Sequence, residues 1–152
     1  MDMNQFSCKA TGNGTPPGHN GHEHPVALTL LSFGEPVVVG AFLCYHTADP
    51  IAVTVSFSTS TRVPIDWVFA RDLLAEGMVA SAGKGDIRIR PSDQEDRLVM
   101  FHLETPSGSA DFSANRDQLD GFLKCTAELV PFGHEAKWLD IDSSITRLLA
   151  DE

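Results

Sequence analysis

The chain has 152 residues and a mass of 16.5 kDa, a size that predicts one domain with a full hydrophobic core. Its 11 basic and 21 acidic residues give a net charge of −10, which argues against direct binding to nucleic acid or to an anionic membrane, because both need a cationic face. The longest apolar run is well short of the roughly 18 residues that cross a bilayer, so we expect no direct membrane insertion.

The cysteines and the first residues of the chain indicate the cellular compartment. Cys8, Cys44 and Cys125 are scattered along the chain and do not make a disulfide framework. The first residues lack the basic and apolar regions of a secretory leader. These features predict a cytoplasmic protein with reduced thiols.

The first 25 residues are rich in Gly, Asn, Pro and His, and they predict a flexible arm ahead of a domain over residues 26–152. Within this arm, His19, His22 and His24 are close enough in sequence to bind a transition metal opportunistically. A zinc site usually needs a fourth ligand and a rigid scaffold. We therefore interpret these histidines as part of a solvated tail, and we predict neither a metal site nor a cofactor.

A run of strands is predicted after the arm. Residues 26–33 form the first strand, which ends in a turn at residues 34–36. Residues 37–45 are apolar on both faces and predict a central, well-covered strand. Apolar and polar residues then alternate over residues 53–57, which indicates a strand with one buried face.

The stretch from Tyr45 to Gly77 is the unit around which the rest of the fold is predicted to form. Its first part is a turn, because proline restricts its own backbone and that of the residue before it. The turn residues are Thr47, Asp49 and Pro50. A strand follows in which Pro64 suggests either an edge position or a strand start, and the apolar period then changes to that of a short helix. The predicted core positions of this second part are Trp67, Phe69, Leu73 and Leu74, and Gly77 suits a left-handed residue that ends the helix.

The second half of the chain predicts three further strands over residues 87–90, 97–104 and 109–114, followed by a helix over residues 115–129. A last helix is expected over residues 142–150. Strands followed by helices indicate an α+β fold with a mostly antiparallel sheet of about seven strands and two or three helices.

Two motifs in this half invite chemical interpretations that we weigh against structural ones. Gly83-Lys84-Gly85 does not have the spacing of a phosphate-binding loop, so we predict a hairpin or loop. His102 lies within an apolar run, where a core or interface histidine is the expected role.

Five phrases of the sequence occur together and in order: T-A-D-P-I-A-V (47–53), W-V-F-A-R-D-L-L-A-E-G (67–77), G-D-I-R-I-R-P (85–91), F-L-K-C-T (122–126) and L-D-I-D (139–142). In combination they resemble the SsgA-like family of actinomycete sporulation and cell-division proteins. The resemblance covers residues 26–150. It implies a fold like that of the Whirly single-stranded-nucleic-acid-binding proteins, and a homotrimer.

The resemblance also implies a function. Members of this family are small, acidic, non-catalytic proteins of septum placement and spore-wall work, and the best-understood type recruits the tubulin-like division protein FtsZ to future septa together with a paralogue. We therefore expect an adaptor at the division septum, with FtsZ and SsgA-like paralogues as partners. A paralogue that controls spore-wall synthesis or spore separation through other partners is the alternative.

Several charged residues have more than one possible role. Arg71, Asp72 and Glu76 are our candidates for exposed protein contacts, although a local ion pair is an equal alternative for the first two. A single-stranded nucleic-acid binder is a second hypothesis by fold analogy, and it would need stacking aromatics beside its arginines. Asp140 and Asp142 can be read as the acid and base of a hydrolase, but we interpret them as helix-capping groups.

Overall fold

Seven strands and two α-helices succeed one another in the computed structural model, which describes residues 20–32, 34–57 and 65–139. In chain order the elements are β1 (Gly21–Leu30), β2 (Val37–His46), β3 (Asp49–Phe57), β4 (Ile65–Ala70), α1 (Arg71–Gly77), β5 (Ile87–Pro91), β6 (Leu98–Thr105), β7 (Gly108–Asn115), α2 (Arg116–Leu129) and the short 3-10 helix η1 (Glu135–Trp138). The predicted last helix over residues 142–150, Asp140 and Asp142 lie outside the described residues.

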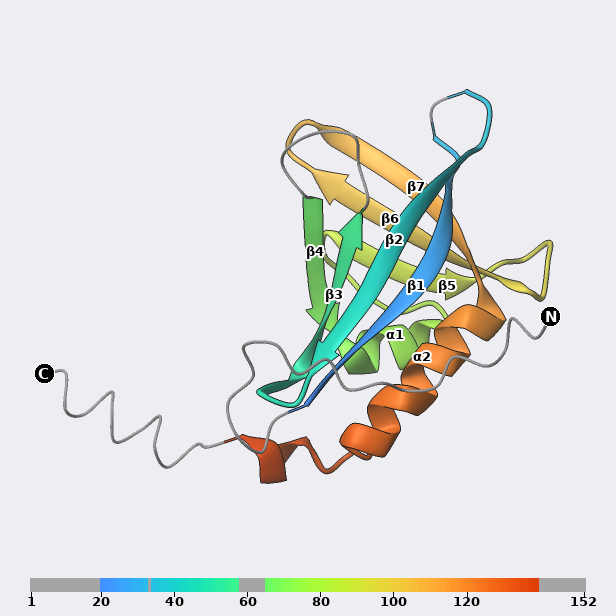
Figure 1. The fold of residues 1–152 in the computed structure, drawn as a ribbon. Coiled ribbons are helices and arrows are strands. Elements are labelled where there is room, and N and C mark those ends of the chain that lie inside the picture. Colours follow the sequence, from blue (N-terminus) through green and yellow to red (C-terminus); the bar gives the residue numbers. More distant parts are fainter. Residues whose placement is uncertain (1–19, 33, 58–64, 140–152) are drawn as a thin grey trace, which may run out of the picture.

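The strands form one antiparallel sheet in the order β4-β3-β2-β1-β7-β6-β5. Strands β1 to β4 pair in chain order, and so do strands β5 to β7. Helix α1 separates the two groups, β4 and β5 are the opposite edges of the sheet, and β7 pairs with β1. The sheet curls strongly, and α1 and α2 lie across its lower end in the view of Figure 1. This arrangement confirms the predicted α+β class and the edge position of β4.

Alternation along the strands builds the core. On β2, Ala41, Leu43 and Tyr45 are buried, and their neighbours on β3 contribute further apolar side chains of the same face. Helix α2 adds Leu119 and Phe122, both of which are fully buried. Asn115 caps α2, which begins at Arg116, because its side-chain oxygen accepts hydrogen bonds from the backbone N–H groups of the first turn.

The boundary predicted at residue 25 is wrong, because β1 begins at Gly21. Residues 21–25 of β1 pair with β2, and His22 and His24 are buried on the inner face of the sheet. Asn20 also exchanges hydrogen bonds of 2.8 Å with Thr47, through its backbone N–H and C=O groups. Burial, and next the neighbouring His22, lower the pKa of His24, which favours the neutral imidazole that a core tolerates.

Strand β2 is central in the order of strands, but it is not covered on both faces as predicted. Val38 is 69% exposed and Phe42 is 41% exposed on the face opposite the core. The sequence pattern shows apolar residues on both faces, and it does not distinguish a second packed layer from an apolar face exposed to solvent. Within the described residues, helices and core side chains cover only one face of β2.

Gly77 ends α1 but does not adopt the left-handed conformation predicted for it, since the glycines with positive φ are Gly34, Gly83, Gly108 and Gly133. It is needed for close packing instead. A Cβ atom at this position would lie 2.4 Å from Cγ2 of Ile89 and 2.9 Å from its backbone oxygen. The absence of a side chain therefore lets α1 lie directly against β5.

We expect Gly77→Ala to lower the free energy of unfolding by about 1–3 kcal/mol, because the added methyl group forces helix and strand apart in a packed core. The measurement is a chemical denaturation midpoint with its slope. Ile89→Ala removes the Cγ2 atom of this clash, so the double variant should lose less stability than the sum of the two single losses, whereas additive losses would show that the two residues do not clash.

Candidate interaction surface

Arg71 is not an exposed contact residue, and this corrects the sequence prediction. It lies at the first position of α1, and only 1% of it is exposed. Its Nη1 donates to the backbone oxygens of Val130, at 2.6 Å, and Thr126, at 3.3 Å. The side chain therefore binds the carbonyl groups at the C-terminal end of α2, where it adds a second donor to the Thr126 oxygen, which also accepts from the Val130 N–H, and donates to Val130, the residue that follows the helix.

The charge of Arg71 is compensated from several sides. Its Nη2 lies 2.7 Å from Oε1 of Glu135, whose side chain is 17% exposed. The hydrogen bond from Arg71 is the main cause that lowers the pKa of Glu135. The guanidinium also packs over the rings of Tyr45 and Phe132, at 4.9 and 4.1 Å from their centroids. The ion pair of Arg71 is therefore formed with Glu135, 64 residues away, and not with the neighbouring Asp72 as the local alternative predicted.

The turn of the same motif is also structural. Thr47 and Pro50 are buried, and Asp49 is exposed where β3 begins. The Tyr45 hydroxyl donates to the backbone oxygen of Pro50 at 2.8 Å, and burial raises the pKa of Tyr45 to about 12. This turn and Arg71 meet at the Tyr45 ring, so the two halves of the motif hold the lower end of the domain together.

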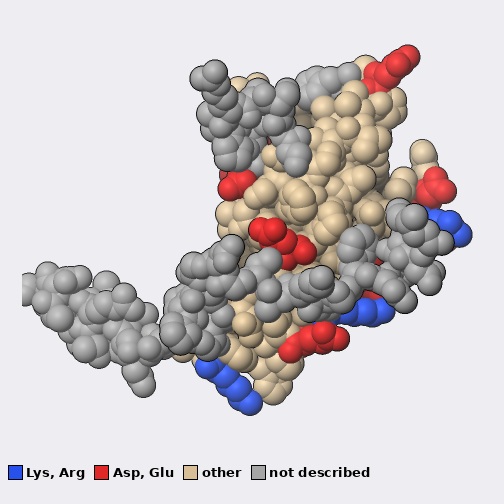
Figure 2. Space-filling view, viewed as in Figure 1, with Lys and Arg blue, Asp and Glu red and all other residues tan. Residues whose placement is uncertain are grey.

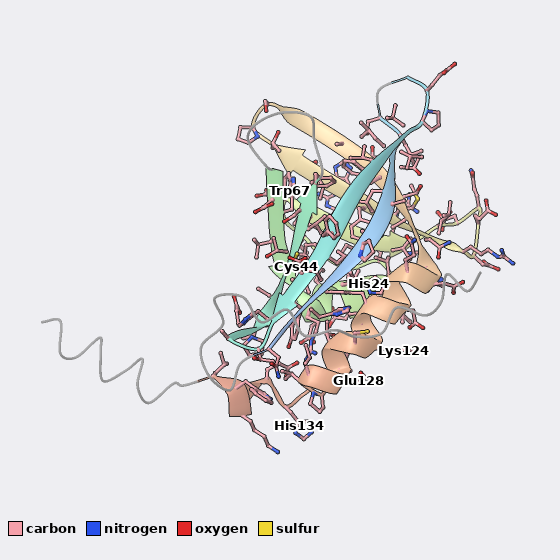
Figure 3. All side chains as sticks on the ribbon, viewed as in Figure 1. His24, Cys44, Trp67, Lys124, Glu128 and His134 are labelled. Atoms are coloured by element: carbon pink, nitrogen blue, oxygen red, sulfur yellow. The ribbon has the colours of Figure 1, made fainter. Side chains whose placement is uncertain are left out.

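Four apolar residues of the motif divide into two pairs. Phe69 and Leu74 belong to the buried core as predicted, whereas Trp67 and Leu73 are partly exposed and pack against its edge. Trp67 lies on the edge strand β4, near the open upper end of the sheet in Figure 3. There it lines an apolar groove of about 410 Å³ together with Phe57 and with residues 103–112 of β6 and β7.

Because Trp67 is half-buried, we expect Trp67→Ala to cost about 2 kcal/mol, which is less than the roughly 3–5 kcal/mol of a fully buried aromatic residue. Thermal and denaturant unfolding of the variant would measure this. A loss equal to that of Phe69→Ala would contradict the partial exposure.

The other two candidate contact residues, Asp72 and Glu76, are exposed on α1. They lie one helical turn apart, and α1 packs next to β4 and β5. Both side chains are therefore accessible to a partner, and their role in binding stays a prediction.

The most distinctive surface is the outer face of β2, β3 and β4, which we call the outer sheet face. Cross-strand pairing places its residues in adjacent rows: Val38, Gly40, Phe42 and Cys44 on β2, Thr54 and Ser56 on β3, and Asp66 and Val68 on β4. Asp66 is the one charged residue of this set. Val68 is 60% exposed, and Phe42 lies two strands away in the neighbouring row. Figure 2 shows a broad surface without Lys or Arg in the upper part of the molecule, with acidic side chains near the centre of that view.

The arginines of β5 lie on a different surface. Arg88 and Arg90 are exposed and, with His102 and Asp111, line a hollow on the outer side of β5–β7. Arg90 is paired with Asp93 at 3.4 Å, and the hollow contains acidic groups besides the arginines. This surface lacks the uninterrupted cationic groove with stacking aromatics that single-stranded nucleic acid requires.

His102 is part of this surface and not of the core, so the core role is wrong and the interface role stays a prediction. Its Nδ1 lies 2.6 Å from Asp111 Oδ1, and its Nε2 lies 3.1 Å from Glu104 Oε1. The hydrogen bonds to these two carboxylates raise the pKa of His102. Ser32 contacts Asp111 and not the imidazole, so the arrangement does not match a nucleophile with its general base.

Together, the curled seven-stranded antiparallel sheet, the two helices at its end and the sparsely charged outer sheet face define a small α+β protein with an exposed apolar surface. Among the described helices, none has both the length and the apolar character needed to cross a bilayer. Residues 39–135 match the family described as Streptomyces sporulation and cell division protein, SsgA. The chain belongs to this SsgA-like family, as the sequence motifs predicted.

Relatives with names also belong to sporulation-specific cell division. The chain is 44% identical over 121 residues to the sporulation-specific cell division protein SsgB of Saccharopolyspora erythraea, covering 79% of this chain and 86% of the relative. It is 42% identical over 123 residues to SsgB of Streptomyces coelicolor, covering 80% and 90% of the two chains.

Solved structures are similar in fold as well. The SsgA-like sporulation-specific cell division protein from Thermobifida fusca superposes with a TM-score of 0.74 at 37% identity, over 90% of this chain and 98% of that one. A second structure has a TM-score of 0.74 at 38% identity, over 80% of this chain and 97% of that one. Its description states that mutations in SsgB correlate to longitudinal cell division during sporulation of Streptomyces coelicolor.

Proposed function

We propose that this protein is a non-catalytic adaptor of sporulation-specific cell division, which helps to select septum sites and recruits FtsZ to them. The observation that carries the proposal is the family membership, with relatives named for sporulation-specific cell division at 42–44% identity over most of both chains. The buried motif supports it: Arg71, Tyr45 and Thr47 stabilise the fold, which leaves the surface as the site of function. The proposed location is cytoplasmic, at the division septum.

The outer sheet face is the proposed contact surface. Val38, Phe42 and Val68 expose apolar area with Asp66 as the one charged residue among the outer sheet face residues, and exposed apolar area of this kind is typical of the centre of a protein interface. Asp72 and Glu76, both exposed on α1, are the proposed acidic contacts that accompany it. A partner with an apolar patch bordered by basic residues would complement this combination.

Binding experiments with purified FtsZ and SsgA-like paralogues from the same actinomycete test the proposal. Phe42→Asp and Val68→Asp should each weaken binding about tenfold or more, since they place a charge in the middle of the interface. Val79→Asp is the matched control, because Val79 is 82% exposed after α1 and lies off the sheet. Binding by neither protein class, or equal loss in the control, would contradict the adaptor role on this face.

The oligomeric state must be measured alongside, because the resemblance implies a homotrimer that can use the same face. Light scattering of each variant separates the two effects. A variant that keeps the wild-type mass and loses FtsZ binding supports the adaptor surface. A variant that dissociates into monomers instead assigns the face to the trimer. Placement of FtsZ rings in sporulating cells that carry each variant then tests septum-site selection and distinguishes it from a role in spore-wall synthesis.

A further inference from the structure

Two histidines that the sequence analysis assigned to a solvated tail lie beneath α2. His22 and His24 are two residues apart on β1, and therefore both point to the inner face of the sheet. Cys125 faces them from α2 and is also buried. Figure 3 shows His24 where β1 passes α2. Two imidazoles and one sulfur thus meet in the interior from elements that are about a hundred residues apart in sequence.

The distances between these groups are close to those of a metal site. One potential ligand atom from each of His22, His24 and Cys125 lies within 4.8 Å of the other two. Nε2 of His22 and Nδ1 of His24 are 3.2 Å apart. Ligand atoms around tetrahedral zinc are roughly 3.3–3.8 Å apart, so closure onto an ion needs side-chain movements of about 1 Å.

The surroundings hold the two imidazoles in place. Phe122 of α2 stacks against His22 and meets His24 edge-on, with both pairs of ring centroids 6.1 Å apart. A Cβ atom at Gly121 would lie 3.6 Å from Cε1 of His24, an ordinary van der Waals distance, so this part of α2 packs directly over the ring. A rigid scaffold of this kind is what the isolated histidine-rich sequence lacked.

We propose that His22, His24 and the reduced sulfur of Cys125 form a zinc site. Cys125 is disulfide-bonded in this structure, whereas Cys44 is a free thiol, so the expectation of reduced thiols is not met at Cys125. Disulfide and zinc site are alternative states of the same sulfur atom. The proposal goes beyond the adaptor function and does not depend on it.

The change between the two states is a two-electron reduction. A dithiol reductant transfers two electrons and two protons to the disulfide and is itself oxidised to a cyclic disulfide. The Cys125 thiol then loses its proton as its sulfur binds Zn²⁺, and the two neutral imidazoles donate nitrogen lone pairs. A nitrogen and thiolate ligand set favours zinc over magnesium or calcium, and the fourth position is available to water.

The test is zinc binding by the full chain without an affinity tag, titrated in competition with a chromophoric chelator. One sample is oxidised. The other is reduced by a phosphine, which takes up oxygen from water to form its oxide as the disulfide becomes two thiols. The reduced chain should bind one Zn²⁺, and the oxidised chain should bind at least tenfold more weakly. Co²⁺ in place of zinc should give the near-ultraviolet charge-transfer absorption of a cobalt–thiolate bond.

Variants assign the ligands. His24→Ala and Cys125→Ser should each weaken zinc binding by roughly tenfold or more, since each removes one of three ligands. Cys44→Ser and His134→Ala should bind as the wild type does, because these residues lie on the outer sheet face and beside η1. Circular dichroism shows whether each variant is folded, and the cobalt spectrum of the wild type provides a result that needs no variant. Equal zinc binding by oxidised and reduced chains, unchanged affinity in Cys125→Ser, or a cobalt spectrum without the thiolate band would each overturn the proposal.

Discussion

Replacing Arg71 with leucine is expected to lower the free energy of unfolding by about 3–5 kcal/mol, the cost of removing one partner of a buried ion pair. The guanidinium is buried to all but 1%, and it binds the backbone oxygens of Thr126 and Val130 as well as the carboxylate of Glu135. Leucine would fill part of the space and donate no hydrogen bond. The C-terminal end of α2 would therefore lose its cap, and the Tyr45 and Phe132 rings would lose the cation between them.

Denaturant unfolding of both chains measures this loss. Asp72→Leu is the matched control, because it places the same residue at the next, exposed position of α1, where substitutions usually change stability by less than about 0.5 kcal/mol. Similar losses at the two positions would contradict the structural role of Arg71.

The ion pair also predicts a dependence of stability on pH. Arg71 lowers the pKa of Glu135 below its ordinary value of 4.5, so the folded state binds this proton more weakly than the unfolded state does. The contribution of the pair is therefore fully present above pH 4.5 and is lost as the pH falls through the lower pKa of the folded state. Glu135→Gln should remove this part of the acid dependence. An unchanged stability profile below pH 4.5 would show that the pair contributes nothing.

Deleting residues 1–25 is expected to destabilise the domain by at least about 3 kcal/mol relative to a chain that begins at Asn20. The longer deletion removes half of β1 and two buried side chains, His22 and His24, and loss of a large buried side chain typically costs about 2–5 kcal/mol. It also removes the pairing of residues 21–25 with β2 and the two hydrogen bonds between Asn20 and Thr47.

Both truncated chains lack Cys8 and retain Cys44 and Cys125, so the comparison is made under reducing conditions, which keep these two thiols from oxidising. Thermal unfolding of the two truncated chains gives the difference directly. Equal stabilities would mean that the domain begins at residue 26, as the composition of the N-terminal residues suggests.

The His-rich segment shows why composition misled the prediction of the domain boundary. Gly21, His22 and His24 are polar or small, and a polar, glycine-rich segment normally cannot bury enough apolar area to stay ordered. Here the neighbouring strand supplies the pairing and Phe122 of α2 supplies aromatic contacts. The only signal in the sequence was the alternation of His22, Glu23 and His24, which is too short to indicate a strand.

Local chemistry was enough to predict most of the elements and the family. The period of two in β3, the change of period after Trp67 and the Asn115 cap arise from neighbours along the chain, so the sequence carries them directly. The burial of Arg71, the need for Gly77 and the exposure of the outer sheet face depend on contacts between elements that are distant in sequence. These contacts are the packing of α1 against α2 and β5, and the covering of the sheet by helices on one side. The neighbouring elements decide whether a charged side chain is buried, whether a glycine is needed for close approach and whether an apolar face is exposed. These neighbours are distant in sequence, and only the tertiary structure brings them together.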